Sequence, residues 1–210
     1  MHNPLSPQGF PIMRMTQLTL ACVCLLYTSS AWAHRPVFTD DAATGPGTAV
    51  PMGGPEVSQV VYREITEDSP QVWLRFDVPE DFQLYVQIGV PVLERLKDFR
   101  PAMVVVGPGL PTENPPFALP EGMGAKVLGT ADVEKPRLFH EHFTGTDSWI
   151  LRSATVDLPD SGRYYLVAYS PEGKTGKLWL SIGRKERFTA DDWKQFPAWR
   201  KRIRAFHESP

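Results

Sequence analysis

The sequence predicts an all-β protein: an antiparallel β-sandwich of the jelly-roll kind, followed by a short helical tail. Three observations predict this class. Apolar residues alternate with polar ones over 72–78 and 82–90, a period of two that is typical of half-buried strands. The 16 glycines and 21 prolines of the chain punctuate such runs at short intervals. Helical spacing is confined to 93–99 and 189–210.

The strands can be placed one by one from these patterns. They are predicted at 58–65, 72–78, 82–90, 102–107, 148–158, 163–170 and 177–183. With short additions this gives roughly seven to nine strands, as expected for a sandwich. Pro159 and Gly162 bound a tight turn between two of them. Residues 107–124 are rich in proline and glycine and too long for a simple connection, which predicts a functional loop or a flap.

The N-terminus has the pattern of an export signal. Arg14 precedes the apolar run "LTLACVCLLY", and Ala31-Trp32-Ala33 places small residues at −3 and −1 of a cleavage site. The run of about ten residues is too short to cross a bilayer of roughly 30 Å. We therefore expect residues 1–33 to be a signal peptide with an over-extended start, cleavage between Ala33 and His34, and a periplasmic or secreted protein.

The composition of the mature chain limits its partners. Both cysteines, Cys22 and Cys24, would leave with the signal, so an exported protein of 177 residues would rely on its core rather than on disulfides. Its net charge would be −3, since Arg14 is the sole charged side chain that is removed, and this disfavours nucleic acid. No later apolar run has the length of a transmembrane segment. We expect an N-terminal arm at 34–56, a sandwich domain at 57–186 and a tail at 187–210.

The tail is predicted to be a basic amphipathic helix. Thr189 can cap its start, and Pro197 is predicted to begin a second helix. Trp199, Ile203 and Phe206 share one stripe, which packs on the sandwich in the favoured interpretation. The alternative is peripheral contact of this stripe and its basic neighbours with anionic lipid.

Residues 70–183 resemble a known family. The stretches "VWLRFDVPEDFQLYVQIGVP", "RPAMVVVGPGL" and "DSGRYYLVAYSPEGKTGKLWLSIG" are similar to the bacterial pre-peptidase C-terminal domain, most closely over 162–167. The resemblance implies a jelly-roll-like module of exported proteins. It implies no catalytic residues, because the family has none of its own to carry over.

Three histidines are the candidate metal ligands. If cleavage leaves His34 at the N-terminus, its α-amine and Nδ1 can chelate one ion, since both lose their protons near neutral pH. His140 and His142 are two apart, so in a strand both imidazoles project from one face, with Phe139 and Phe143 on the other. Glu141 falls between the two phenylalanines, which suggests that the segment is irregular or lies at a sheet edge.

This pattern predicts the metal ion. Three nitrogen ligands in a tetragonal arrangement suit Cu(II). The arrangement resembles the histidine brace of exported copper proteins, which is matched here at the N-terminal position alone. The competing interpretation is that His34 follows the cleavage site by accident and that the H-x-H pair is merely exposed. His207, near the end of a basic helix, is expected to be solvated and is not included.

The leading functional hypothesis is thus an exported, non-enzymatic binding module, with Cu(II) as the specific ligand. One alternative is a module that recognises a protein or glycan through exposed aromatic side chains, judged by the exposure of Trp73, Tyr85 and Trp179. A third hypothesis, a copper-dependent oxidase, ranks last, because no substrate motif is present. The chain also has no G-x-S-x-G elbow and no phosphate-binding loop.

Overall fold

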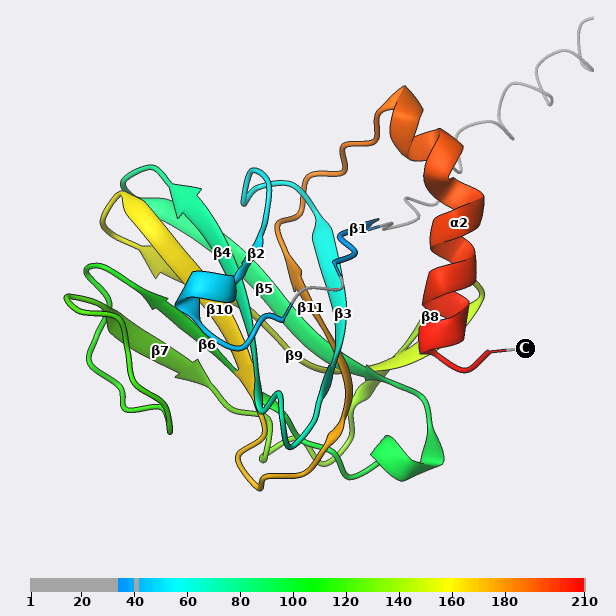
Figure 1. Ribbon diagram of the computed structural model, residues 1–210, viewed down its shortest axis with the longest axis horizontal. Coiled ribbons are helices and arrows are strands. Elements are labelled where there is room, and N and C mark those ends of the chain that lie inside the picture. Colours follow the sequence, from blue (N-terminus) through cyan, green and yellow to red (C-terminus); the bar gives the residue numbers. More distant parts are fainter. Residues whose placement is uncertain (1–33, 40–41, 210) are drawn as a thin grey trace, which may run out of the picture. The chain divides into compact units, whose positions relative to one another are not determined.

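The computed structural model describes residues 34–39 and 42–209. The expected signal peptide, 1–33, lies outside the described residues. The described chain forms two β-sheets and a C-terminal helix, which confirms the predicted all-β sandwich with a helical tail (Figure 1). In chain order its elements are β1 (Arg35–Pro36), η1 (Pro46–Thr48), β2 (Val50–Pro51), β3 (Gln59–Ile65), β4 (Gln71–Val78), β5 (Phe82–Pro91), η2 (Glu94–Leu96), β6 (Ala102–Gly107), β7 (Gly124–Leu128), β8 (Arg137–Glu141), β9 (Thr146–Leu158), β10 (Gly162–Tyr169), β11 (Gly176–Ile182) and α2 (Ala190–Phe206).

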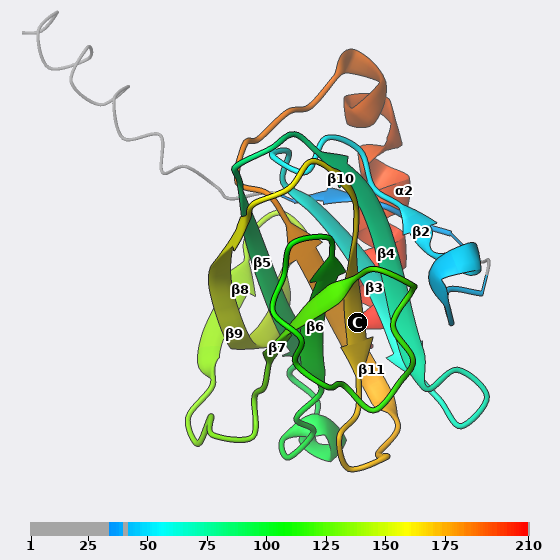
Figure 2. The ribbon, with the colours of Figure 1, turned by 90° about the vertical axis from the view of Figure 1, so that its left-hand side faces the viewer.

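The two sheets have different coverings, after which we name them. The helix-side sheet has the strand order β1-β3-β11-β5-β9-β8, and the loop-side sheet has the order β2-β4-β10-β6-β7. Figure 2 looks onto the loop-side sheet, with the strands of the helix-side sheet behind it. Strand pairs are antiparallel, except that the two-residue strands β1 and β2 pair in parallel with β3 and β4. β8 pairs with β9 alone among the described strands and so forms an edge of the helix-side sheet.

The hydrophobic core lies between the sheets and is built from the predicted alternations. Leu74 and Phe76 of β4, and Leu84, Val86 and Ile88 of β5, are at most 2% exposed. Burial of one such side chain contributes about 1.5–3 kcal/mol. All six residues of β6 are buried, as its unbroken apolar run predicts, because both faces of this strand are covered.

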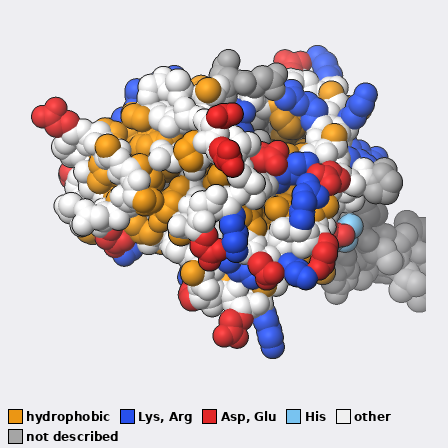
Figure 3. All heavy atoms as spheres, turned by 60° about the horizontal axis from the view of Figure 1, so that its bottom comes forward, with side chains coloured by type: hydrophobic (Ala, Val, Ile, Leu, Met, Phe, Trp, Pro, Cys, Tyr) orange, Lys and Arg blue, Asp and Glu red, His pale blue; other side chains and the backbone are white. Residues whose placement is uncertain are grey.

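The 107–124 loop covers the outer face of the loop-side sheet. The Phe117 ring lies 5.3 Å from that of Trp73 and 5.8 Å from that of Tyr169. Trp73 is consequently 1% exposed. Figure 3 shows hydrophobic side chains gathered on the half of the visible surface that holds β7 and this loop, while charges of both signs cover the other half. The long loop thus acts as a cap on an apolar sheet face.

Three features differ from the sequence-based expectations. β7 lies at the end of the Pro/Gly-rich segment, and β8 contains part of the H-x-H segment; both are short edge strands with weak patterns of their own. The predicted second helix at Pro197 is wrong, because α2 continues through this residue. Pro197 is exposed, and the packing of Trp199 and Ile203 on the sheet offsets the hydrogen bond that proline cannot make.

Candidate binding site at the C-terminal helix

A capping box starts α2 and ties it to the N-terminal arm. The Asp192 carboxylate accepts hydrogen bonds from the Thr189 backbone N–H at 2.7 Å and from the Thr189 hydroxyl at 2.8 Å, and the Asp192 N–H donates to that hydroxyl at 3.2 Å. Arg35 of β1 forms an ion pair with the same carboxylate at 3.1 Å. The arm residues just after the expected cleavage site therefore hold the first turn of the helix.

One side of α2 packs on the outer face of the helix-side sheet. Trp199 and Ile203 are 7% and 5% exposed, and the Phe206 ring lies 5.2 Å from that of Tyr62 on β3. The apolar stripe of the tail is thus buried on the sandwich, as the favoured interpretation predicts. No helix of the described part of the chain combines the length and apolar character needed to cross a membrane.

A small cavity, which we call the chamber, remains between α2 and this sheet. Its volume is about 40 Å³. Most of its wall is apolar, including the aromatic residues Tyr62, Phe139, Phe143, Trp179, Phe196 and Trp199. Its polar lining residues are His34, Glu141, Thr144, Thr146, Ser148 and His207. Apolar walls with a few convergent polar groups are typical of binding pockets.

The two histidines of the chamber are held neutral by their surroundings. His34 Nδ1 shares a hydrogen bond of 2.6 Å with the Ser58 hydroxyl, and burial lowers the His34 pKa to about 4. His207 Nδ1 donates to the Ile203 carbonyl at 2.9 Å, and its Nε2 lies 3.0 Å from Ser148 Oγ, which accepts from Trp179 Nε1 at 3.1 Å. Burial also lowers the His207 pKa. Neither imidazole carries a charge at neutral pH as a result.

The expectation that His207 is solvated is therefore wrong. The residue is 6% exposed and caps the C-terminal end of α2. His207 follows Ile203 by four residues, so its ring lies on the side of α2 that packs on the sheet, where its Nε2 meets Ser148 Oγ. The helical spacing of four residues from Trp199 to Ile203 leads next to His207. This pattern would have placed His207 on the packed side of the helix.

The pKa values of Glu141 and Tyr62, which also line the chamber, are shifted as well. Burial raises the Glu141 pKa, although its Oε1 accepts a hydrogen bond of 3.1 Å from the Phe143 N–H. Burial, with a smaller contribution from Glu141, raises the Tyr62 pKa. The chamber thus disfavours charge of either sign.

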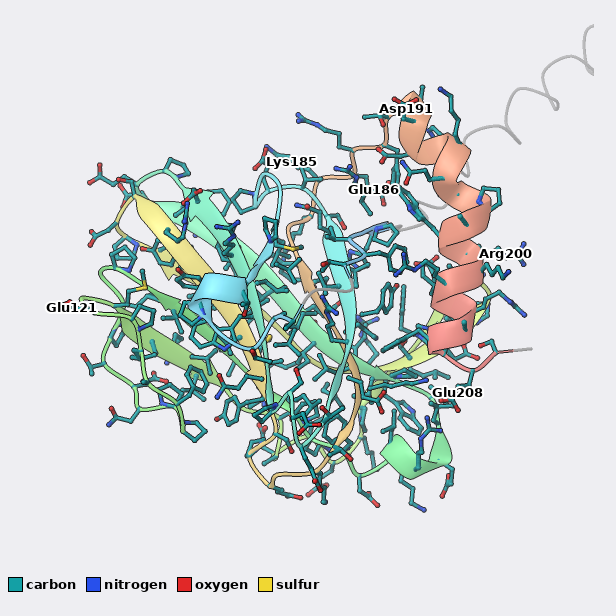
Figure 4. All side chains as sticks on the ribbon, in the orientation of Figure 1. Glu121, Lys185, Glu186, Asp191, Arg200 and Glu208 are labelled. Carbon is teal, nitrogen blue, oxygen red and sulfur yellow. The ribbon has the colours of Figure 1, made fainter. Side chains whose placement is uncertain are left out.

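A larger open groove lies on the outer side of the same helix. Its volume is about 640 Å³, and it is lined by Phe143, Phe196, Pro197, Arg200, Lys201, Arg204, Ala205 and Ser209. No carboxylate belongs to this lining. Arg204 donates one hydrogen bond of 3.0 Å to the Thr144 carbonyl, while Arg200 and Lys201 make no hydrogen bond or ion pair with the described residues. Figure 4 shows Arg200 on the outward side of α2.

The acidic groups nearest to these cations in the sequence already have partners. Asp191 pairs with Lys194 at 2.7 Å, and Asp192 pairs with Arg35. Glu208 pairs with Arg95 and with Lys177, and these hydrogen bonds lower its pKa to about 2. The groove is thus a basic surface on a chain whose net charge is −2.

The histidines predicted to bind metal are only partly brought together. His140 and His142 lie side by side, with ring centroids 4.9 Å apart, and both are exposed. His140 Nδ1 is 2.7 Å from Asp147 Oδ1. Phe139, Glu141 and Phe143 line the chamber with His34, whereas the H-x-H pair does not. Within the described residues, no group of three or more His, Cys, Asp or Glu side chains could hold a metal ion.

The proposed row of exposed aromatic side chains is not formed by the residues chosen for it. Trp73 and Trp179 are 1% and 4% exposed. Tyr85 is half-buried, with the Arg184 guanidinium 4.1 Å from its ring. The 107–124 loop covers Trp73, and Trp179 lies under α2 in the chamber wall, so later segments of the chain cover both tryptophans. Among the described residues, the large aromatic side chain that is exposed is that of Trp193 on α2, at 59%.

Sequence reasoning found the basic cluster of the groove but not its apolar wall. Arg200, Lys201 and Arg204 are visible as a run of charges. Phe143 lies in the turn between β8 and β9, and no sequence pattern shows that it meets Phe196 of α2. The sequence pattern placed Phe143 on the same face as Phe139, but it indicated no partner for this side chain.

Comparison with known proteins finds low-identity matches among solved structures. No family model and no curated protein matches the chain. A periplasmic inhibitor of g-type lysozyme from Aeromonas hydrophila has 15% identity and a TM-score of 0.38, over 64% of this chain and 94% of the inhibitor. The pre-peptidase C-terminal domain of a Bacillus anthracis collagenase has 12% identity and a TM-score of 0.34, over 64% of this chain and 93% of that domain.

A third solved structure is the secreted copper-binding protein MopE from Methylococcus capsulatus. It has 12% identity and a TM-score of 0.28, over 73% of this chain and all of the MopE chain. The resemblance to the pre-peptidase C-terminal domain is thus found again among solved structures, at low identity. Likenesses of this size carry no conclusion about what this chain binds.

Proposed function

We propose that the protein is an exported, non-enzymatic binding module, and that the groove on α2 binds an acidic segment of a partner protein. The observation that supports this most is the groove itself. It combines three cations with two aromatic side chains and has no carboxylate in its lining. Such a surface favours a partner that carries both carboxylates and apolar groups.

The charge balance around the helix supports an external anionic partner. The carboxylates of α2 and of the residues after it are engaged by Arg35, Lys194, Arg95 and Lys177. Arg200 and Lys201 therefore have no carboxylate of their own within the described chain. An acidic segment would gain charge-assisted hydrogen bonds from the guanidinium groups without displacing an internal ion pair.

A protein segment fits this surface better than a lipid bilayer does. An interfacial helix must turn its apolar face to the acyl chains. Here the apolar face of α2, with Trp199 and Ile203, is buried on the helix-side sheet. The histidines of the chamber are engaged in hydrogen bonds that stabilise the helix, and we assign them no catalytic role.

Reversing the groove charges should abolish binding of an acidic peptide. We expect the R200E/K201E double variant to bind a fluorescein-labelled, glutamate-rich peptide at least 10-fold more weakly, because two attractive charges become repulsive. Fluorescence anisotropy at low and moderate salt measures this effect, and added salt should weaken the native interaction.

The matched control is the K174E/K185E double variant, which changes the net charge equally at two exposed lysines outside the groove. It should bind almost as the native protein does. An equal loss in both variants would show a general charge effect and contradict a site at the groove. Binding to anionic vesicles but not to the peptide would contradict a protein partner.

Cu(II) binding through His34 with His140 or His142 is a second candidate function. The adjacency of the exposed imidazoles of His140 on β8 and His142 in the turn after it favours this function, since nitrogen ligands suit Cu(II). The described geometry does not assemble the three ligands, because His34 Nδ1 is bonded to Ser58 in the chamber. Binding as a brace would need that hydrogen bond to break.

Calorimetric titration of the processed protein with Cu(II) tests this candidate. A brace predicts that one extra residue before His34 weakens binding at least 10-fold, because the chelating α-amine becomes an amide. The H140A/H142A double variant should weaken it as well. Equal affinity of the native and extended chains would exclude the brace.

A further inference from the structure

The groove and the chamber share two wall residues. Phe143 and Phe196 line both, and their rings contact each other edge-on. We infer that the groove and the chamber are one binding site, in which a bound acidic segment inserts one short, neutral side chain between Phe143 and Phe196 into the chamber. This inference rests on the proposed function and specifies what the partner segment must contain.

The Phe143 and Phe196 side chains, which line both spaces, form the partition between the groove and the chamber. Phe143 belongs to the turn between β8 and β9, and Phe196 belongs to α2, so the two sides come from separate elements. Both rings are half-buried. A change of rotamer at one of them requires no movement of the sheet or the helix and is fast for a side chain that solvent reaches. The cations of the groove lie on the outer side of this partition.

The size of the chamber limits what can enter. A water molecule needs about 10–15 Å³ of such volume. The chamber, at about 40 Å³, therefore has room for roughly three non-hydrogen atoms. Counted beyond Cβ, threonine and valine have two such atoms and leucine has three, so these side chains fit, whereas an indole ring does not.

The polar groups of the chamber select a neutral side chain. Desolvation lowers the pKa of His34 and raises that of Glu141. It would also make the insertion of a charged partner side chain into the chamber energetically unfavourable. The Tyr62 hydroxyl and the second ring nitrogen of His34 make no hydrogen bond with the described residues, and both half-buried side chains line the chamber. A hydroxyl or amide tip that enters the chamber could form a hydrogen bond with either group.

A peptide series tests the inference. The probes are glutamate-rich peptides that differ at one central position, which is glycine, threonine, leucine, lysine or tryptophan. We expect the threonine and leucine peptides to bind the native protein about 10-fold more tightly than the glycine peptide. The lysine and tryptophan peptides should bind no better than glycine. Tightest binding by tryptophan or lysine would overturn the inference.

A pair of variants on β8 locates the effect. Phe139→Trp enlarges a side chain that lines the chamber but not the groove. It should reduce the ratio of threonine-peptide or leucine-peptide affinity to glycine-peptide affinity, when all three peptides are measured on the same variant, to about one. Leu138→Trp is the matched control, because Leu138 is on the opposite face of the same strand and is 62% exposed.

The outcomes separate the two proposals. If no acidic peptide binds, the proposed function fails. If the glycine peptide binds at the groove and the central residue has no effect, or if Phe139→Trp and Leu138→Trp behave alike, the chamber inference alone is refuted. Circular dichroism of both variants checks that each retains the native strand content.

Discussion

Replacing Trp199 by alanine is expected to detach α2 from the helix-side sheet and to abolish binding at the groove. Trp199 is 7% exposed and forms part of the chamber wall. Truncation of a buried tryptophan to alanine typically costs about 3–5 kcal/mol. A single helix is marginal in water without its packing, so this loss should fall on α2 rather than on the core between the sheets.

Hydrogen exchange measures this result directly. The amides of 190–206 should lose their protection, while those of β5 and β6 keep theirs, because the core between the sheets is not changed. Trp193→Ala is the matched control, since Trp193 lies on the same helix and is 59% exposed. Protection of α2 that is equal in both variants would contradict the described docking of the helix.

Acidification is expected to destabilise the packing of α2 through the two histidines of the chamber, of which His34 is half-buried and His207 is buried. The His34 pKa falls from 6.5 in the unfolded chain to about 4 in the folded protein. The unfolded chain therefore binds more protons than the folded protein between these pH values, and stability falls as the pH drops from about 6.5 to 4. A shift of this size corresponds to at most about 3 kcal/mol. His207, whose pKa is also lowered, acts in the same direction.

The other titratable groups of the chamber act differently. The raised pKa of Glu141 means that the folded protein gains a proton there first, so this residue offsets part of the loss as the pH falls. Tyr62 stays protonated throughout this range because its pKa is raised. The net result is a loss of stability in acid that is smaller than the two histidines alone would give.

Urea unfolding at pH 7 and pH 4.5 tests this balance. His34→Gln keeps a polar side chain near Ser58 but removes the titration, so its stability should fall less with pH than that of the native protein. His140→Gln is the control, because His140 is exposed on β8. If the native protein is as stable at pH 4.5 as at pH 7, His34 is not neutral and buried as described.

The strands of the sandwich could be predicted because their side chains have a strict period. The alternation over 72–78 and 82–90 reflects one face turned to the core, and the unbroken run of β6 reflects two covered faces. β7 and β8 carry no such pattern, since short edge strands are shaped by their neighbours rather than by burial. The sequence pattern did place Phe139 and His140 on opposite faces of an extended segment, and in the structure Phe139 is half-buried and His140 is exposed.

The site could be predicted only in part, because it joins segments that are distant in the chain. The cap of α2 at Thr189 and the basic face of the helix are local patterns, and both could be predicted from the sequence, whereas the reciprocal hydrogen bonds of Asp192 in the capping box were found in the structure. The chamber depends on the arm, β8 and α2 meeting on one sheet, which no local pattern records. His34 was selected for its expected place at a cleavage site, whereas the structure shows its ring hydrogen-bonded to Ser58 under the helix.

The central claim, that an acidic partner binds beside α2, is tested most directly by mapping where the peptide contacts the protein. Amide chemical-shift changes on titration with the leucine-containing acidic peptide would provide this map. The account predicts changes concentrated in 141–146 and 196–206, which border the groove and the chamber. Changes concentrated in β7 and the 107–124 loop, with α2 unaffected, would contradict it.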